Sequence, residues 1–332
     1  VSPDSALAQT VAVAEQQFGS VKLISPAEIY KSIASSTQKK IAEASGDYYT
    51  STVDSGAKKK LGVFMDEISA TQKPAVFFAG EPITFFTTIK AQSLDFSVNL
   101  KMKCEADGVV GQVTPDNAEF FAKELAGDAD FYDSAELGCI LSEKETSKLS
   151  AGSQTIKMTS SFNFVTRAYI NAYFIDADKK RELDRRNLLN QLTSSLPANT
   201  LTAITTSGPV KIGLGAGSQP IGISPRDENG PTIGVTIENS GSGHVKSISS
   251  VLFLLPKGLS IKDVNGQTDV AEKMSCFDLE DVEEKGCDEK IVEVYKINTD
   301  KIAAILWKGI AVSGPIVPFD FITFRVHTQL DD

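Results

Sequence analysis

The chain has 332 residues, of which 41% are hydrophobic and 23% charged, and its formal net charge is −10. This length is too great for one compact core, so two or three domains are expected. The acidic charge argues against nucleic acid as a partner, because phosphate binding needs a basic surface. No apolar run reaches the roughly 18 residues of a membrane-spanning helix. The chain starts at Val1 without a signal-peptide pattern, so membrane contact is expected only through a segment upstream of residue 1.

The N-terminal stretch, residues 1–73, predicts a helical region. It is rich in Ala, Ser, Lys, Glu and Gln and lacks the alternation of apolar and polar residues that strands show. Ser25 followed by Pro26 is a typical helix start, with serine at the N-cap and proline at the first helical position. Apolar residues continue on one helical face as far as Ala44, and a second helix is expected over residues 57–69.

Residues 74–177 predict the first β-rich domain, because strand-length runs of Phe, Ile, Thr and Val are broken there by glycine and proline. Every second residue of 96–104 is apolar, so Cys104 is expected on the inward face of a strand. A short helix is expected over residues 117–125. Strands within residues 154–175 complete the domain.

Residues 178–208 are expected to connect this domain to a second one. The stretch 176–192 predicts a charged helix whose basic residues alternate with acidic ones, which favours a solvent-exposed, salt-bridged surface. A docking face for an acidic partner, or for the acidic loops of a neighbouring copy, is the alternative. The Ser/Thr/Pro-rich stretch 193–209 marks the boundary.

Residues 209–332 predict a second β-rich domain. Short runs of β-branched and aromatic residues, separated by turn signals, indicate an antiparallel sandwich. The regular strand–helix alternation of doubly wound α/β folds is absent. The expected strands are residues 210–214, 232–238, 251–255, 291–297, 302–310 and 318–328.

Two glycine-rich stretches have some features of nucleotide-binding loops. In residues 241–247, GSGHVKS, Val245 stands where a phosphate-binding loop needs a glycine before its lysine, and a strand rather than a helix follows. In residues 213–217, GLGAG, Ser218 breaks the dinucleotide fingerprint and Pro220 prevents an immediate helix. We interpret the first as a turn between strands and the second as a strand end, and expect no cofactor.

Clustered carboxylates are the candidates for a metal site, because Ca²⁺ prefers oxygen ligands. One cluster lies in an expected loop between Cys104 and Cys139, and the other lies between Cys276 and Cys287. Neither has the glycine and glutamate positions of an EF-hand loop, and two solvated acidic loops are the alternative. The candidate calcium ligands are Asp128, Asp130, Asp133, Asp278 and Asp281.

The four cysteines form one pair in each β-rich region. The chain has no C-x-x-C motif and only two histidines, which argues against structural zinc. Two local disulfides, Cys104–Cys139 and Cys276–Cys287, are therefore expected, and they imply an oxidising environment outside the cytoplasm. Four buried free thiols in a cytoplasmic protein are the alternative.

No arrangement of residues in the sequence indicates catalysis. The two histidines, His244 and His327, lie in a glycine-rich turn and near the C-terminus, and no G-x-S-x-G nucleophile elbow occurs. We therefore expect no catalytic residues and no enzymatic activity. A cleft that brought one of these histidines beside a carboxylate and a hydroxyl would favour an enzyme instead.

Three stretches of the chain carry a resemblance to a known class of module. Residues 235–241, VTIENSG, and 252–259, LFLLPKGL, resemble the V-x-x-x-N-x-G and L-P-x-G strand pair of immunoglobulin-like modules. These modules occur in archaeal and bacterial cell-surface and S-layer-associated proteins. Residues 164–176 are similar to the last strand of such modules. The resemblance spans residues 75–330 in outline and brings no catalytic residues with it.

The resemblance implies two immunoglobulin-like antiparallel β-sandwich domains in an extracellular, surface-attached protein. We expect a non-enzymatic structural or adhesive function, with self-association into a surface layer or filament, or binding to another surface protein. Exposed edge strands or the N-terminal segment would make the contacts, because strand addition gives affinity through backbone hydrogen bonds. The alternative is a calcium-dependent module that binds a glycan or a protein through the acidic loops.

Overall fold

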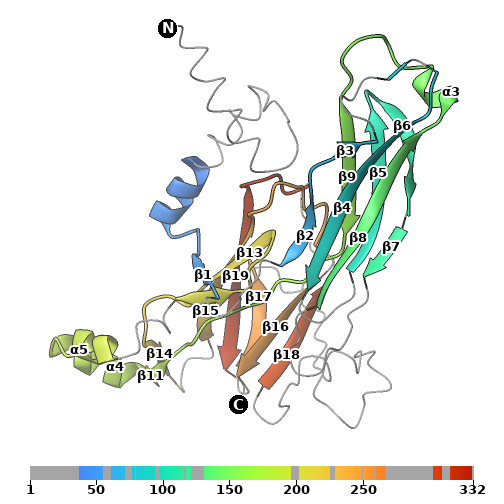
Figure 1. The fold of residues 1–332 in the computed structure, drawn as a ribbon. Coiled ribbons are helices and arrows are strands. Elements are labelled where there is room, and N and C mark those ends of the chain that lie inside the picture. Colours follow the sequence, from blue (N-terminus) through green and yellow to red (C-terminus); the bar gives the residue numbers. More distant parts are fainter. Residues whose placement is uncertain are drawn as a thin grey trace, which may run out of the picture. The chain divides into compact units, whose positions relative to one another are not determined.

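In the computed structural model the chain divides into two compact units. Unit 1 comprises Val1–Ile29 and Lys60–Val165, and unit 2 comprises Tyr30–Lys59 and Thr166–Asp332. Both are mainly β, as the sequence predicted, and contain several antiparallel sheets (Figure 1). The structure describes residues 37–54, 61–71, 77–78, 80–93, 98–115, 117–120, 131–195, 202–224, 229–248, 250–256, 259–265, 302–308 and 315–330.

Unit 1 contains two groups of strands linked by one shared strand. In the first group β4 pairs with β8 on one side and with β2 and β3 on the other; in the second β5 pairs with β9 and β7. The strand β6 pairs with both β5 and β8 and so belongs to both groups. The elements are β2 (Gly62–Met65), β3 (Ser69–Ala70), β4 (Ile83–Ser93), β5 (Val98–Ala106), β6 (Val109–Thr114), β7 (Asn117–Phe120), β8 (Phe131–Leu141), α3 (Glu143–Thr146) and β9 (Ile156–Phe162).

The core of unit 1 draws on both groups of strands. Ile89 of β4 and Leu137 of β8 are fully buried together with Leu100 of β5. Within this core a disulfide joins Cys104 of β5 to Cys139 of β8, with the Cα atoms 6.0 Å apart. The apolar alternation predicted for β5 is confirmed, because its even-numbered residues from 98 to 106 are all buried. The disulfide therefore cross-links the two groups from inside the core.

Unit 2 is built around a four-stranded antiparallel sheet with the order β13–β15–β19–β17. Two more strands, β16 and β18, form an antiparallel pair, while β1 pairs in parallel with β12, which pairs with β10. The strands are β1 (Ser51–Val53), β10 (Ala168–Tyr169), β11 (Phe174–Asp176), β12 (Ala203–Thr205), β13 (Val210–Gly215), β14 (Ile221–Ile223), β15 (Asn229–Asn239), β16 (Ser250–Pro256), β17 (Leu259–Val264), β18 (Ile302–Lys308) and β19 (Phe321–Leu330).

The core of unit 2 lies against one face of the four-stranded sheet. Val235 and Ile237 of β15 pack there with Phe324 and Val326 of β19, and Leu255 of β16 belongs to the same cluster. The predicted strands over residues 210–214, 232–238, 251–255 and 302–310 are present to within a few residues at their ends. The strand expected at residues 291–297 lies outside the described residues.

The charged connector forms two helices rather than one. The first, α4 (Ala177–Arg185), begins at Asp176, whose carboxylate accepts hydrogen bonds from the backbone N–H groups of Asp178 and Lys179. The second, α5 (Leu189–Ser195), follows after a turn. Two ion pairs, Arg181–Asp178 and Arg186–Glu182, lie on the exposed surface of this region. They agree with the expected salt-bridged surface.

Two of the expected helices are not found, one in the N-terminal region and one in the first β-rich domain, and residues 1–36 of the N-terminal region lie outside the described residues. Residues 37–45 are helical, but the helix expected over 57–69 is replaced by the strands β2 and β3, and the helix expected over 117–125 begins as the strand β7. Pairing with β4 and β5 overrides weak local propensity at these positions. The division into compact units assigns Tyr30–Lys59 to unit 2. In the part of the chain that the structure describes, no helix combines the length and the apolar character needed to cross a membrane.

Candidate functional site

The central strand of unit 2, β15, is buried on both faces. Its residues alternate, with Val235 and Ile237 on the core face and Gly234, Thr236 and Glu238 on the other. All five are buried. A strand of this pattern usually has one face in water, so something else covers the second face. Residues 37–54, more than 180 positions away in the sequence, provide the cover, and we call them the docking segment.

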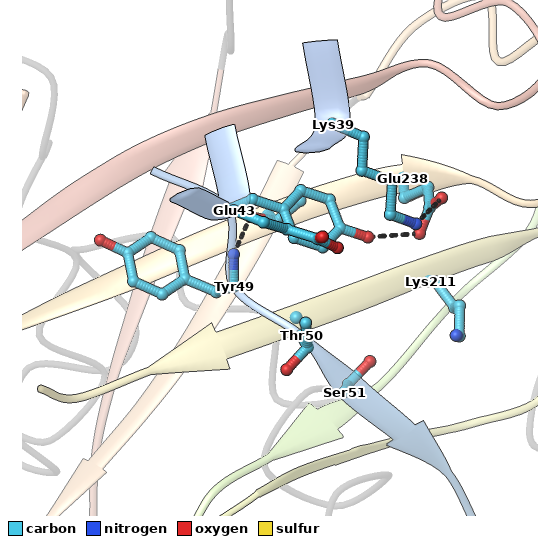
Figure 2. Close-up of a pocket in the computed structure, with 10 residues that line it drawn as sticks. Lys39, Glu43, Tyr49, Thr50, Ser51, Lys211 and Glu238 are labelled. Carbon is cyan, nitrogen blue, oxygen red and sulfur yellow. Dashed lines mark hydrogen bonds and ion pairs between the residues drawn. The ribbon is translucent and has the colours of Figure 1, made fainter. Parts of the chain in front are cut away.

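Glu238 of β15 binds the docking segment through its carboxylate (Figure 2). It is only 8% exposed, and its carboxylate accepts a hydrogen bond from Lys39 Nζ at 2.7 Å and another from the Tyr48 hydroxyl at 2.7 Å. The ammonium group of Lys39 also lies 4.7 Å from the centroid of the Tyr48 ring. The same ring meets Phe321 of β19 edge-on, with centroids 5.1 Å apart. Both carboxylate oxygens are therefore satisfied by the docking segment.

The protonation states of this cluster follow from burial and pairing. Burial raises the pKa of Tyr48 to about 12, so the phenol keeps the proton that it donates to Glu238. Burial alone would lower the pKa of Lys39, but its hydrogen bonds with Glu238 and Tyr48 outweigh this, and the pKa is raised overall. Lys39 is therefore a cation beside a carboxylate. Charge-assisted hydrogen bonds of this kind are stronger than neutral ones.

Three glycines on β13 and β15 form a flat surface under Tyr49, which we call the glycine floor. A Cβ at Gly213 would lie 1.8 Å from the Tyr49 carbonyl oxygen, one at Gly215 would lie 2.2 Å from its Cδ1, and one at Gly234 would lie 1.8 Å from its Cζ. No other residue type leaves room for the backbone and ring of Tyr49 at these positions. The Tyr49 N–H also donates to the Thr236 hydroxyl at 3.0 Å.

Two further contacts hold the docking segment, one at Asp47 and one at its C-terminal end. Asp47 forms an ion pair with Arg325 of β19, and the pKa of Arg325 is raised first by its interaction with Tyr49 and then by Asp47. At the C-terminal end β1 adds to β12 as a parallel strand, and the N–H of Asp54 donates to the carbonyl of Thr205 at 2.9 Å. The segment is thus held by side chains and by backbone hydrogen bonds.

A small cavity remains between the docking segment and the sheet (Figure 2). Its volume is about 100 Å³, which is room for a few water molecules but below the roughly 300–1,000 Å³ of typical ligand pockets. We interpret it as a gap between two packed parts of unit 2 and not as a ligand pocket. Its lining residues are Lys39, Glu43, Tyr48, Tyr49, Thr50, Ser51, Lys211, Gly213, Thr236 and Glu238.

The stretch that resembled a phosphate-binding loop is a connection between strands. Buried Asn239 organises it: its side-chain amide donates to the carbonyls of Gly243 at 2.7 Å and Ile316 at 2.9 Å, and its oxygen accepts from the N–H of Gly241 at 3.1 Å. Val245 forms an isolated bridge with Ile316, and the next regular element is the strand β16. The helix N-terminus that phosphate binding requires is not there.

Only one of the predicted calcium ligands, Asp133, lies within the described part. It belongs to strand β8, opposite Ala91 of β4, and not to a loop as expected, because pairing with β4 extends from Leu141 back to Phe131. No group of three potential metal ligands occurs among the described residues. The other candidates, Asp128, Asp130, Asp278 and Asp281, and the expected disulfide Cys276–Cys287 lie outside the described residues.

The two histidines occupy different surroundings. His244 is exposed in the loop after Asn239. His327 Nδ1 lies 2.6 Å from Asp263 Oδ1, across the pair of strands β19 and β17. This is a histidine beside a carboxylate, but the pair lies outside the lining of the cavity described above.

The docking segment was missed by sequence reasoning, although one signal for its site was present. Glycine inside a strand often marks a close approach of another part of the chain, and Gly213, Gly215 and Gly234 all lie inside strands. Nothing in the local pattern identifies Tyr49 as the residue that approaches. A comparison with known protein families and with curated proteins finds no match for this chain.

Proposed function

We propose that this protein is a non-enzymatic structural or adhesive protein of the cell surface, whose copies associate into a layer or filament. The observation that carries the proposal is the docking segment. A short piece of chain completes unit 2 by adding a strand to β12 and by inserting Tyr49 over the glycine floor. Strand addition of this kind is a common way in which extended segments bind to folded domains.

The proposal includes two immunoglobulin-like sandwiches and an extracellular location. In unit 1, a buried disulfide between strands of two different groups is consistent with the inter-sheet disulfide of immunoglobulin domains. Disulfides persist mainly in oxidising compartments, which supports a location outside the cytoplasm.

Edge strands offer further contacts for association. Among the described strands, β9 of unit 1 pairs only with β5, and β17 of unit 2 pairs only with β19. The edge of a sheet is where a further strand adds, through its backbone N–H and C=O groups. Partners of this type are another copy or a second surface protein.

The test is the size and shape of the oxidised chain in solution. We expect light scattering to show a mass that rises with protein concentration, and negative-stain electron microscopy to show regular assemblies. A monomer at every concentration would contradict the proposal. Calorimetry with Ca²⁺ and with EDTA separates it from the calcium-dependent alternative, for which binding heat and a higher melting temperature are expected with Ca²⁺.

A further inference from the structure

The docking segment reaches its site across a large gap in the sequence. Lys39 and Glu238 are 199 positions apart, Tyr49 and Thr236 are 187 apart, and Asp47 and Arg325 are 278 apart. The whole of Lys60–Val165, which belongs to unit 1, lies between the two parts of unit 2. Unit 2 is therefore completed by a piece of chain that is continuous with the other unit.

The docking site is complementary to one particular segment. It combines the glycine floor, a carboxylate that accepts from Lys39 and Tyr48, and the edge of β12 to which β1 pairs. Without the segment, Glu238 would lose both of these hydrogen-bond donors, and β12 would lose a strand partner. Each of these groups is costly to leave unpaired when buried. A vacated site is thus best satisfied by an identical segment.

We propose that unit 2 also accepts the docking segment of a second copy of this chain, so that copies associate by exchanging residues 37–54. This inference rests on the proposed function and names the segment and the site that make the contact. The exchanged contacts are the same as those within one chain, so concentration decides the balance between the two forms. Reciprocal exchange gives closed dimers, and one-directional exchange gives an open chain of copies.

The Lys39–Glu238 ion pair allows a direct test on the unmodified chain. Unlabelled and ¹⁵N-labelled chains are mixed in equal amounts, concentrated until they assemble, and treated with a carbodiimide, which joins an amine to a carboxylate in contact with it. We expect mixed-isotope Lys39–Glu238 peptides as often as same-isotope ones in the assembled fraction. The control is the Lys90–Asp66 pair of unit 1, also at 2.7 Å, which should remain same-isotope.

The outcomes of this test separate the inference from the proposed function. Assemblies that contain only same-isotope Lys39–Glu238 peptides overturn segment exchange, while self-association itself stands. A chain that remains monomeric at every concentration overturns both.

A pair of complementary variants gives a second test. Gly234→Ala places a Cβ where the Tyr49 ring lies, and Tyr49→Ala removes that ring. In an exchanged heterodimer, the Gly234→Ala chain donates a segment with an intact Tyr49 to the Tyr49→Ala chain, which has an intact Gly234. The Tyr49→Ala chain in turn donates a segment without the ring to the site that carries the extra Cβ. Both sites are therefore filled without a clash. We expect the mixture to form heterodimers that melt at a higher temperature than either variant alone. A mixture that behaves as the sum of its two components contradicts exchange, and Gly243→Ala mixed with Tyr49→Ala serves as the control, because Gly243 has open space around it.

Discussion

The ring of Tyr49 occupies the space that any side chain at position 234 would need. A Cβ at Gly234 would lie 1.8 Å from Tyr49 Cζ, which is far inside the van der Waals contact distance. The two residues are 185 positions apart, yet each determines what the other can be. The relationship identifies the face of β15 opposite the core as a binding surface for residues 37–54.

Gly234→Ala is expected to destabilise unit 2 by about 1–3 kcal/mol, the usual cost of forcing extra atoms into a packed site. The reason is the collision of the new Cβ with the Tyr49 ring. Urea denaturation followed by circular dichroism measures the effect. Gly243→Ala is the matched control, and it should stay within about 0.5 kcal/mol of the original chain because no atom lies within 4 Å of a Cβ there. Equal effects at the two positions would contradict the docked position of Tyr49.

The stability of unit 2 should fall at alkaline pH because of Tyr48. Its pKa is raised to about 12 in the folded protein, against about 10 in an unfolded chain. Between these values the folded state binds the phenolic proton and the unfolded state does not, so a rise in pH favours unfolding. The contribution of Tyr48 is complete below about pH 10 and is lost as the pH rises through about 12. The raised pKa of Lys39 acts in the same direction.

Melting temperatures between about pH 8 and pH 11.5 provide the measurement for Tyr48. The loss of stability with pH should be smaller in Tyr48→Phe, which keeps the ring and removes the titrating hydroxyl. An identical slope in the variant and the original chain would show that folding does not raise the pKa of Tyr48.

Asn239→Ala is expected to destabilise the connection that follows β15. The change leaves the carbonyls of Gly243 and Ile316 without the amide that now donates to them, and the expected cost is about 1–3 kcal/mol. Asn239→Asp should also destabilise, because a carboxylate cannot donate to these carbonyls. The neighbouring Ser240→Ala removes one exposed hydrogen bond and should cost about 0.5 kcal/mol. Chemical denaturation that ranks Ser240→Ala with Asn239→Ala would argue against this role of Asn239.

Reduction of the Cys104–Cys139 disulfide should destabilise unit 1 by about 3–4 kcal/mol, the value expected for a loop of this length. The two cysteines are 35 positions apart and lie in the core. Thermal melts of the oxidised protein, the reduced protein and a Cys104→Ser/Cys139→Ser double variant measure the loss. The double variant should not respond to reductant through this pair, and an unchanged melting temperature on reduction of the original chain would contradict the expectation.

The expected second disulfide has its own measurement. Intact mass should rise on reduction by roughly 4 Da if Cys276 and Cys287 are paired as well, and by roughly 2 Da if Cys104–Cys139 is the sole disulfide, because each disulfide takes up two hydrogens. An unchanged mass would favour free thiols and a cytoplasmic location.

Much of the strand content could be predicted because side-chain periodicity is a local property. The alternation that ends at Cys104 predicted a strand with that residue inward, and Cys104 is 1% exposed. Likewise, Val245 in the glycine-rich stretch was enough to reject a phosphate-binding loop. The prediction of a helix over residues 57–69 was wrong because contacts with a distant strand, and not a local pattern, decided the structure there. The composition of this stretch is compatible with either state, and pairing of β2 and β3 with β4 decided between them.

The candidate site could not be predicted in the same way. Alternation in Val235–Glu238 is typical of a strand with a solvated face, and it carries no information about what covers that face. Lys39 and Tyr48 look like ordinary polar residues of a helical region. Only their position beside Glu238 gives them a shared role, and that position depends on contacts more than 180 residues apart in sequence.

By itself, the sequence determined that the protein is mainly β, that Cys104 faces inward, and that residues 241–247 form a connection between strands and not a phosphate-binding loop. These properties depend on backbone conformation and on the two-residue period of side chains along a strand. Only the tertiary structure decided that residues 37–54 complete unit 2 and that three strand glycines make room for Tyr49. Complementarity of shape and charge between distant segments exists only when the chain is folded, so no local pattern records it.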